Sequence, residues 1–353
     1  MRYPALIIDT NKIRDNTRLL ADKCKKHGIS VAGVTKVFCA IPDAARAMID
    51  GGAYMLADSR IENGKKLSHM NIPKLMLRLP MLSQVDDIVD IFDISLNSEY
   101  DTIKALSDKA IEKGKIHNVI MMVDLGDLRE GVWYEDAVEL AGKILELKGI
   151  KLLGVGVNLT CYGGVIPTYE NLSQLVEIAE EIEKKYAIKL EVISGGNSSS
   201  IHLLDKGEMP KRINQLRLGE SIVLGFETAY GDRIEGTHRD AFKFAAQIIE
   251  IKEKPSVPIG EIGMDAFGQK PVFEDKGIIK RAIVGAGRQD IRPDGIVPKD
   301  EKISVLGASS DHLILDVTES ESEYKVGDIV EFDLTYGGLL AACTSEYVEK
   351  IIV

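Results

Sequence analysis

The stretch Val31-Ala-Gly-Val-Thr-Lys36-Val-Phe-Cys-Ala40 is the best guide to the fold, because its apolar first half ends at a lysine. Pro42 and Asp43 follow, and both residue types are typical of the first turn of a helix. A short apolar run before a helix start indicates a buried strand of a parallel sheet. In a (β/α)8 barrel the functional groups gather at the carboxyl ends of the strands, where Lys36 would lie. Taken alone, Lys36 also fits a solvated surface lysine.

Seven more apolar runs alternate with amphipathic segments in the first two thirds of the chain. This alternation is typical of an α/β protein, and eight repeats of it predict a (β/α)8 TIM barrel over residues 10–235. Its expected strands are 31–35, 53–57, 74–78, 92–96, 118–123, 152–157, 190–194 and 214–218. The clearest intervening helix is 171–182, whose apolar face consists of Leu172, Leu175, Val176, Ile178, Ala179 and Ile182.

The last third of the chain has a different pattern. Strand-like alternation is broken there by Gly, Pro and Asp turns, and we expect no helix comparable to those of the barrel. The pattern predicts a C-terminal antiparallel β domain over 236–353, joined by an N-terminal strand within residues 1–9. The expected strands are 5–8, 244–251, 278–284, 312–317 and 328–334.

Composition and charge exclude several classes of protein. The 353 residues are 45% hydrophobic and 28% charged, which provides for a large core. The net charge of −11 argues against nucleic acid and anionic membranes as partners, since both attract basic surfaces. No stretch approaches the ~20 apolar residues of a membrane span, and we expect no cleavable signal at the start of the chain. The four cysteines form no CxxC pair, so we expect no metal site and a cytoplasmic protein.

Two loops indicate a phosphate group. Ser194-Gly-Gly-Asn-Ser198-Ser-Ser200 follows the seventh expected strand, and Arg217-Leu-Gly219-Glu220-Ser221 follows the eighth. Barrels commonly bind phosphate at these two loops, through backbone N–H groups and helix starts. An ordinary Gly-Ser turn with a helix cap is the alternative for the first loop. Together with a reactive lysine across the barrel, however, a phosphate grip points to one cofactor, pyridoxal 5'-phosphate (PLP).

These motifs, with Val123-Asp-Leu-Gly126-Asp-Leu-Arg129-Glu-Gly131, resemble the alanine racemase superfamily, the fold type III PLP enzymes. Leu56-Ala-Asp-Ser-Arg60-Ile-Glu-Asn63 and Gly307-Ala-Ser-Ser-Asp311 are most similar to its ornithine racemase branch. The resemblance extends over nearly the whole chain. It implies an enzyme that interconverts the L- and D-enantiomers of a free amino acid by two-base proton transfer at Cα, through a Lys36 aldimine.

The resemblance also implies roles for other residues. Arg217 would lie against the pyridine nitrogen, where a permanent cation opposes ring protonation and favours proton exchange over transamination. Arg129 would approach the phenolic oxygen of PLP and the substrate carboxylate. Family active sites are completed across a subunit interface, which implies a homodimer. The remaining matched positions are the phosphate-binding Ser198, Gly219 and Glu220, and Ser310, which would line the substrate pocket of the partner subunit.

Several positions depart from the alanine racemase pattern. Ala40 replaces a phosphate-binding tyrosine, and Met122 replaces a lysine that can be carbamylated beside the arginine. Asn158 stands where those enzymes stack a histidine on the cofactor, so we expect it to bind PLP. Phe267 occupies the place of the catalytic tyrosine, and phenylalanine cannot transfer a proton.

The second base is therefore expected to be another side chain of the β domain. Asp265, two residues before Phe267, is our candidate. An ordinary turn aspartate is the alternative interpretation of that residue, and Asp290 and the tyrosines of the domain are the alternative bases.

Ornithine is the leading substrate by resemblance, and lysine, arginine and alanine remain open. A fold type III decarboxylase or dehydratase, a PLP-carrier protein and a cofactor-independent lysine aldolase are the other classes considered. Arg217 and the absence of a His/Cys cluster from the sequence count against a decarboxylase or dehydratase. The β domain counts against the carrier, which is a bare barrel.

Overall fold

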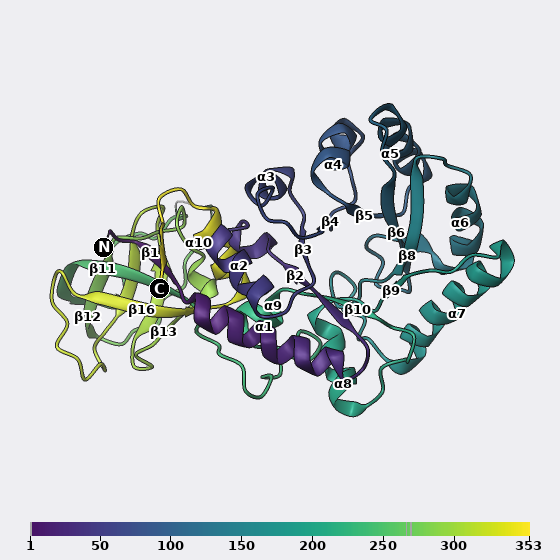
Figure 1. The fold of residues 1–353 in the computed structure, drawn as a ribbon. Helices are drawn as coiled ribbons and strands as arrows, with labels where there is room; N and C mark the ends of the chain where they lie inside the picture. Colours follow the sequence, from purple (N-terminus) through teal and green to yellow (C-terminus); the bar gives the residue numbers. More distant parts are fainter. Residues whose placement is uncertain (1, 266, 269) are drawn as a thin grey trace. The chain divides into compact units, whose positions relative to one another are not determined.

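The structure is a computed structural model that describes residues 2–265, 267–268 and 270–353. It divides the chain into two compact units, Thr10–Arg239 and the combination of Met1–Asp9 with Asp240–Val353 (Figure 1). In the described part of the chain, none of the helices is long and apolar enough to cross a membrane. The same residues contain no group of three or more His, Cys, Asp or Glu side chains arranged to hold a metal ion.

The first unit is a closed barrel of eight parallel strands. Neighbouring strands follow the order β5-β4-β3-β2-β10-β9-β8-β6, and pairing of β5 with β6 closes the circle. The strands are β2 (Ser30–Val34), β3 (Met55–Asp58), β4 (Lys74–Met76), β5 (Ile94–Asn97), β6 (His117–Asp124), β8 (Ile150–Gly156), β9 (Val192–Ser194) and β10 (Gln215–Leu218). The short β7 (Val132–Trp133) pairs with the end of β6. The predicted barrel is confirmed, with strand limits shifted by a few residues.

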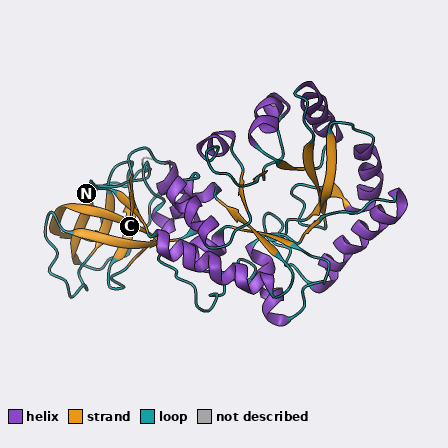
Figure 2. Cartoon of the chain, viewed as in Figure 1, coloured by secondary structure: helices purple, strands orange, loops and turns teal. Residues whose placement is uncertain are grey.

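Helices lie outside the strands of this unit (Figure 2). They are α1 (Thr10–Lys25), α2 (Pro42–Asp50), α3 (Ile61–Lys66), α4 (Val85–Ile91), α5 (Tyr100–Glu112), α6 (Ala137–Leu145), α7 (Tyr169–Tyr186), α8 (Ile201–Lys206) and α9 (Glu220–Leu224). Single 3-10 turns are η1 (Lys36–Phe38), η2 (Leu82–Gln84), η3 (Tyr134–Asp136) and η4 (Ser198–Ser200).

The longest helix, α7, extends beyond the predicted segment 171–182 at both ends. Thr168 and Asn171 cap its start reciprocally, each side chain accepting a hydrogen bond from the other's backbone N–H. The predicted apolar face is buried except for Val176, which is half-buried. The apolar period therefore located the helix correctly, while the cap set its first residue.

Apolar side chains fill the barrel. A buried cluster draws on six different strands, so it is the barrel interior and not one face of an open sheet. Its members are Ala32, Val34, Met55, Ala57, Leu75, Ile94, Leu96, Ile120, Met122 and Leu153. A packed interior leaves the strand ends as the places where polar side chains can meet a ligand.

The second unit is built on a sheet with antiparallel order β13-β16-β11-β12-β15-β14. The N-terminal β1 pairs antiparallel with β11 and parallel with β17. The predicted antiparallel domain is thus confirmed. Its elements are β1 (Ala5–Ile8), β11 (Phe242–Pro255), β12 (Ile278–Val284), η5 (Pro293–Gly295), β13 (Ile296–Pro298), β14 (Ser304–Ala308), β15 (Leu313–Asp316), β16 (Ile329–Leu334), α10 (Tyr336–Thr344) and β17 (Glu349–Ile352).

The expectation of no comparable helix in this unit was wrong, because α10 has nine residues and buries Leu339, Ala342 and Cys343. Its start contains two consecutive glycines, which have low helix propensity and hid the helix from pattern analysis. The second of them, Gly338, is required by packing, since a Cβ there would lie 2.0 Å from the carbonyl oxygen of Gly295. Close packing against η5 therefore requires glycine at this position, although glycine is a poor helix former.

Candidate active site

Lys36 lies just beyond the end of β2, at the start of the turn η1. The preceding Thr35 is fully buried and anchors this position to the next strand. Its Oγ1 donates to Asp58 Oδ2 at 2.6 Å, and its N–H donates to the carbonyl of Ala57 at 2.9 Å. Asp58 is fixed in turn by the side-chain amide of Asn63 at 2.9 Å. The chain therefore leaves the strand at a point held on both sides, with Lys36 as its next residue.

The environment of Lys36 favours a neutral, nucleophilic amine. Surrounding protein atoms lower its pKa by desolvation, and the positive charge of Arg129 acts in the same direction. Electrostatic interactions with Cys161, Asp58 and Glu130 oppose this shift. The side chain nevertheless reaches solvent, as an amine that meets a ligand must. A lowered amine pKa at a strand end is the property expected of a lysine that attacks a carbonyl.

Arg217 is buried inside the same end of the barrel. It pairs with Ala32 across the β10–β2 ladder, which places it on the strand next to the one that leads to Lys36. Its guanidinium donates to the hydroxyl of Ser194, to the carbonyl of Val157 at 2.7 Å and to Asn158 Oδ1 at 2.7 Å. Burial lowers its pKa to about 10, so it remains cationic near neutral pH.

The loop after β6 carries Arg129 and Glu130 on a rigid frame. The carboxylate of Asp124 accepts hydrogen bonds from the backbone N–H groups of Gly126 at 2.8 Å and Leu128 at 3.2 Å. Leu128 adopts a left-handed conformation, which the loop's hydrogen bonds hold in place. The two charged side chains that follow are therefore presented by an ordered backbone.

Asp127 ties this loop to the loop after β8. Its buried carboxylate accepts hydrogen bonds from the backbone N–H groups of Tyr162 at 2.9 Å, Val165 at 3.0 Å and Cys161 at 3.2 Å. Burial would raise the pKa of Asp127, but these donors lower it on balance. Gly163 is needed here, because a Cβ would lie 2.6 Å from the carbonyl oxygen of Asp127.

The loops after β9 and β10 meet through two hydroxyls. Ser198 Oγ donates to Ser221 Oγ at 3.0 Å and accepts from the backbone N–H of Ser221 at 3.2 Å. The turn η4 begins at Ser198 and the helix α9 begins at Glu220, directly after Gly219. First N–H groups of a helix have no partner within it, so the two starts bring polar donors to one place. Burial raises the pKa of Glu220, and the charge of Lys36 opposes this.

Comparisons with known proteins give the family of the chain. Residues 8–225 match the family model described as alanine racemase, N-terminal domain. The chain belongs to the alanine racemase family. It is 52% identical to ornithine racemase of Acetoanaerobium sticklandii over 349 residues, covering 99% of both chains. It is 42% identical to lysine racemase of Thermotoga maritima over 353 residues, again covering 99% of both.

Similarity to solved structures confirms the fold of this family. The alanine racemase of Streptomyces lavendulae superposes with a TM-score of 0.75 at 16% identity, covering 100% of this chain and 98% of that one. At this identity the structural likeness supports the fold alone. The full-length similarity to racemases confirms the predicted enzyme class, and the chain is an amino-acid racemase.

The second unit of this family member carries two predicted site residues. Asp265 is exposed between β11 and β12, and its Oδ1 accepts from the backbone N–H of Phe267 at 2.9 Å. Ser310, exposed after β14, donates from Oγ to Asp311 at 2.9 Å. Asp290 is buried and accepts from the backbone N–H of Gly287 at 2.9 Å, which gives it a structural task within its own unit.

Sequence reasoning missed three residues at the barrel site. Glu130 contacts Arg129, Asp58 accepts from Thr35, and the thiol of Cys161 acts electrostatically on Lys36. Glu130 and Asp58 stand inside motifs already singled out for the family resemblance. Glu130 directly follows the predicted Arg129, which was the available signal. The contacts of Glu130 with Asn158 and of Asp58 with Thr35 join separate segments of the chain and needed the fold.

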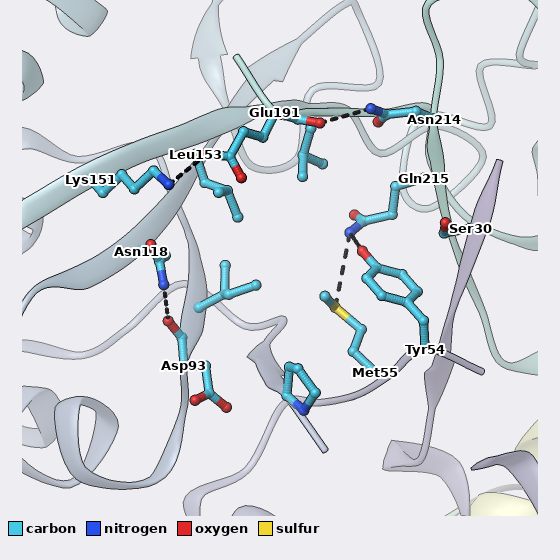
Figure 3. Close-up of a pocket in the computed structure, with 13 residues that line it drawn as sticks. Ser30, Tyr54, Met55, Asp93, Asn118, Lys151, Leu153, Glu191, Asn214 and Gln215 are labelled. Atoms are coloured by element: carbon cyan, nitrogen blue, oxygen red, sulfur yellow. Dashed lines mark hydrogen bonds and ion pairs between the residues drawn. The ribbon is translucent and has the colours of Figure 1, made fainter. Parts of the chain in front are cut away.

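A cavity of about 460 Å³ lies elsewhere in the barrel (Figure 3). Residues at the beginnings of the strands line it, among them Ser30, Tyr54, Lys151 and Gln215. Lys151 pairs there with Glu191 at 2.5 Å. Because Lys36 follows β2 and Arg217 lies near the end of β10, this cavity is at the opposite end of the barrel from the candidate active site.

Proposed function

We propose that the protein is a PLP-dependent racemase of free ornithine. The proposal rests on two side chains carried by neighbouring strands. Lys36 is an amine of lowered pKa, and Arg217 is a buried cation. The preference for ornithine rests on the higher identity to ornithine racemase, 52%, than to lysine racemase, 42%.

The described residues fit PLP in their chemistry. Lys36 supplies an amine for an aldehyde, and Arg217 supplies a fixed cation for the ring nitrogen, with Asn158 as its neighbour. The hydroxyl of Ser198 and the helix start at Gly219 and Glu220 would hold the phosphate, as helix starts commonly do. When bound, PLP supplies a carbonyl for the substrate amine and a conjugated ring that takes up the charge left at Cα.

The residues of the chain then bind the substrate and move its proton. Arg129 is positioned to receive the substrate carboxylate, because its side chain is partly exposed beside the barrel mouth. Lys36 Nζ exchanges a proton with Cα on one face, for which its lowered pKa is suited. Inversion requires a second proton-transfer group on the opposite face.

We infer that Asp265 of a second copy of the chain is this group and that Ser310 of that copy lines the substrate pocket. The enzyme is thus a homodimer, with the barrel as its PLP-binding domain over 10–235 and the β domain over 236–353. Exposure of Asp265 and Ser310 in the single chain supports a role in contacting another molecule. The scattered spacing of the four cysteines, with no CxxC pair, supports the reducing cytoplasm as its location.

Chiral chromatography of reactions with L- and D-ornithine, lysine, arginine and alanine tests the proposal. The PLP-loaded enzyme should convert either enantiomer of ornithine to the racemate, with the highest kcat/KM of the panel. Preference for lysine would keep the racemase and overturn the substrate. Failure to racemise any of the four would contradict the proposed function.

A further inference from the structure

Glu130 connects the two site arginines. Its carboxylate accepts two hydrogen bonds from Arg129, one from Nε and one from the terminal nitrogen Nη2 at 2.6 Å. The same carboxylate accepts from the side-chain amide of Asn158, which lies after the next barrel strand. Asn158 Oδ1 in turn accepts from Arg217 at 2.7 Å. Four side chains from three separate loops and strands thus form one continuous chain of hydrogen bonds.

The pattern of donors and acceptors shows how Glu130 helps to fix the orientation of Asn158 in this hydrogen-bonded series. Arginine only donates and a carboxylate only accepts, so Asn158 can satisfy both neighbours in a single orientation. Its amide nitrogen must face Glu130, and its oxygen must then face Arg217. Without the carboxylate, Arg217 alone holds the Asn158 side chain, and the amide nitrogen loses the acceptor that fixes its position.

Charge adds to this geometric argument. The side chain of Glu130 is only 15% exposed, so its charge is largely removed from water and depends on these partners. It opposes the positive charges of Lys36, Arg129 and Arg217, all of which it influences. Met122, within the barrel core, offers no charge. Glu130 is therefore an anion that contacts Arg129 directly and acts on Lys36 and Arg217 through its charge.

We propose that Glu130 is a positioning residue of the reaction, which holds Arg129 directly and Arg217 through Asn158. This inference rests on the proposed function, since it assumes that the two arginines serve cofactor and substrate. It gives Glu130 no direct contact with either molecule. Its positioning effect on turnover passes through Asn158 and its effect on substrate binding through Arg129, while its charge also acts on Lys36.

The first test separates these two routes. Glu130→Gln cannot accept from both Arg129 and Asn158 without turning an N–H against a donor, so kcat should fall roughly 10- to 100-fold and KM should rise. Glu135→Gln, an exposed residue five positions along the chain, is the matched control and should stay within about twofold of wild type in both constants. Wild-type kcat and KM for Glu130→Gln would overturn the proposal.

A double mutant tests the route through Asn158. In an Asn158→Ala background, Glu130→Gln should lose most of its effect on kcat and keep its effect on KM. Effects on kcat that do not add in the double mutant are expected when one residue acts through the other. Independent, additive losses in kcat would contradict positioning through Asn158.

A third measurement needs no cofactor. Competitive labelling of lysines in the cofactor-free protein, followed on the Lys36 peptide by mass spectrometry, reports the pH at which this amine becomes reactive. Glu130→Gln removes a negative charge and should shift that curve to lower pH, whereas Glu135→Gln should not. Glu130→Asp keeps the charge but is too short for Asn158, so its curve should follow wild type while its kcat remains low.

The outcomes distinguish the two proposals. An inactive wild type would refute the proposed function, and the labelling curve would still decide whether Glu130 acts on Lys36. An active wild type with an unshifted curve and normal kinetics for Glu130→Gln would refute the role of Glu130 alone.

Discussion

The two ends of the barrel differ in chemistry although the same eight strands build both. At the carboxyl end, Lys36, Arg129, Arg217 and Glu130 act on one another, and burial shifts the pKa of both Lys36 and Arg217. At the amino end lies the cavity of about 460 Å³, where Lys151 and Glu191 form a solvated ion pair with side chains 52% and 57% exposed. The end of the barrel that holds the cavity thus says less about where the active site is. Charged groups that shift one another's pKa values mark a functional site more reliably than empty volume does.

Replacing one lysine at each end should give the largest contrast. Lys36→Ala removes the amine that serves both cofactor attachment and proton transfer, and racemisation should fall on the order of 1000-fold or more. Lys151→Ala breaks only a solvated pair and should leave kcat/KM within about twofold. Chiral assays of the two variants check this, and comparable losses from both would erase the distinction between the ends.

The second expected effect concerns whether the carboxyl end of the barrel supplies both proton-transfer groups or needs one from the β domain of a second copy. Asp265→Asn keeps the shape of the side chain and removes the base, so racemisation in both directions should fall roughly 100- to 10,000-fold. Exchange of the Cα proton with heavy water on the Lys36 face should persist, and NMR can follow it. An Asp265→Asn enzyme with near-normal racemisation would exclude this residue and direct attention to the tyrosines of the β domain.

Replacing Arg217 should slow racemisation less than the two changes above, and it should yield a distinctive side product. Arg217→Glu places a carboxylate at the ring nitrogen and favours its protonation, which should slow racemisation roughly 30- to 1000-fold and release keto acid by transamination. Tyr54→Phe is its control, since Tyr54 ends the hydrogen-bonded series that runs from Arg217 through Ser194 and Gln215. A Tyr54→Phe enzyme that also makes keto acid would show that the two ends are chemically coupled.

The smallest expected effect is on stability and depends on pH. The folded-state pKa of Asp127 is lowered, so its carboxylate stabilises the fold above its unfolded pKa of about 3.9, and this contribution is lost as the pH falls through the folded value. Asp127→Asn should cost about 1–3 kcal/mol at neutral pH. Thermal unfolding of both proteins from pH 7 to pH 3 should show the difference shrinking toward acid; a constant difference would contradict this role.

Sequence patterns predicted the barrel because its strands are buried on both faces and appear as continuous apolar runs. Lys36 and Arg217 could be placed for the same reason, since each stands at or just past the end of such a run. The helix α10 was missed because packing against η5 requires glycine where the helix starts. Local pattern cannot reveal a requirement set by a segment about 40 residues away.

The network around Glu130 marks a similar limit within the candidate site. Glu130 and Asn158 are 28 residues apart, and their contact depends on the pairing of β6 with β8. Sequence reasoning identified Arg129 and Asn158 separately through the family resemblance, but the residue that joins them became visible only through the hydrogen bonds. Residue types were thus predictable at this site, whereas their partners required the fold.

Identifying the lysine that binds the cofactor tests most directly whether the active site lies at the carboxyl end of the barrel. Reduction of the PLP-loaded protein with borohydride fixes the cofactor on its lysine, and peptide mass spectrometry then identifies that residue. We expect attachment at Lys36, with loss of the visible absorbance band. Attachment at Lys151 or any other lysine would contradict the assignment of the active site to the carboxyl end of the barrel.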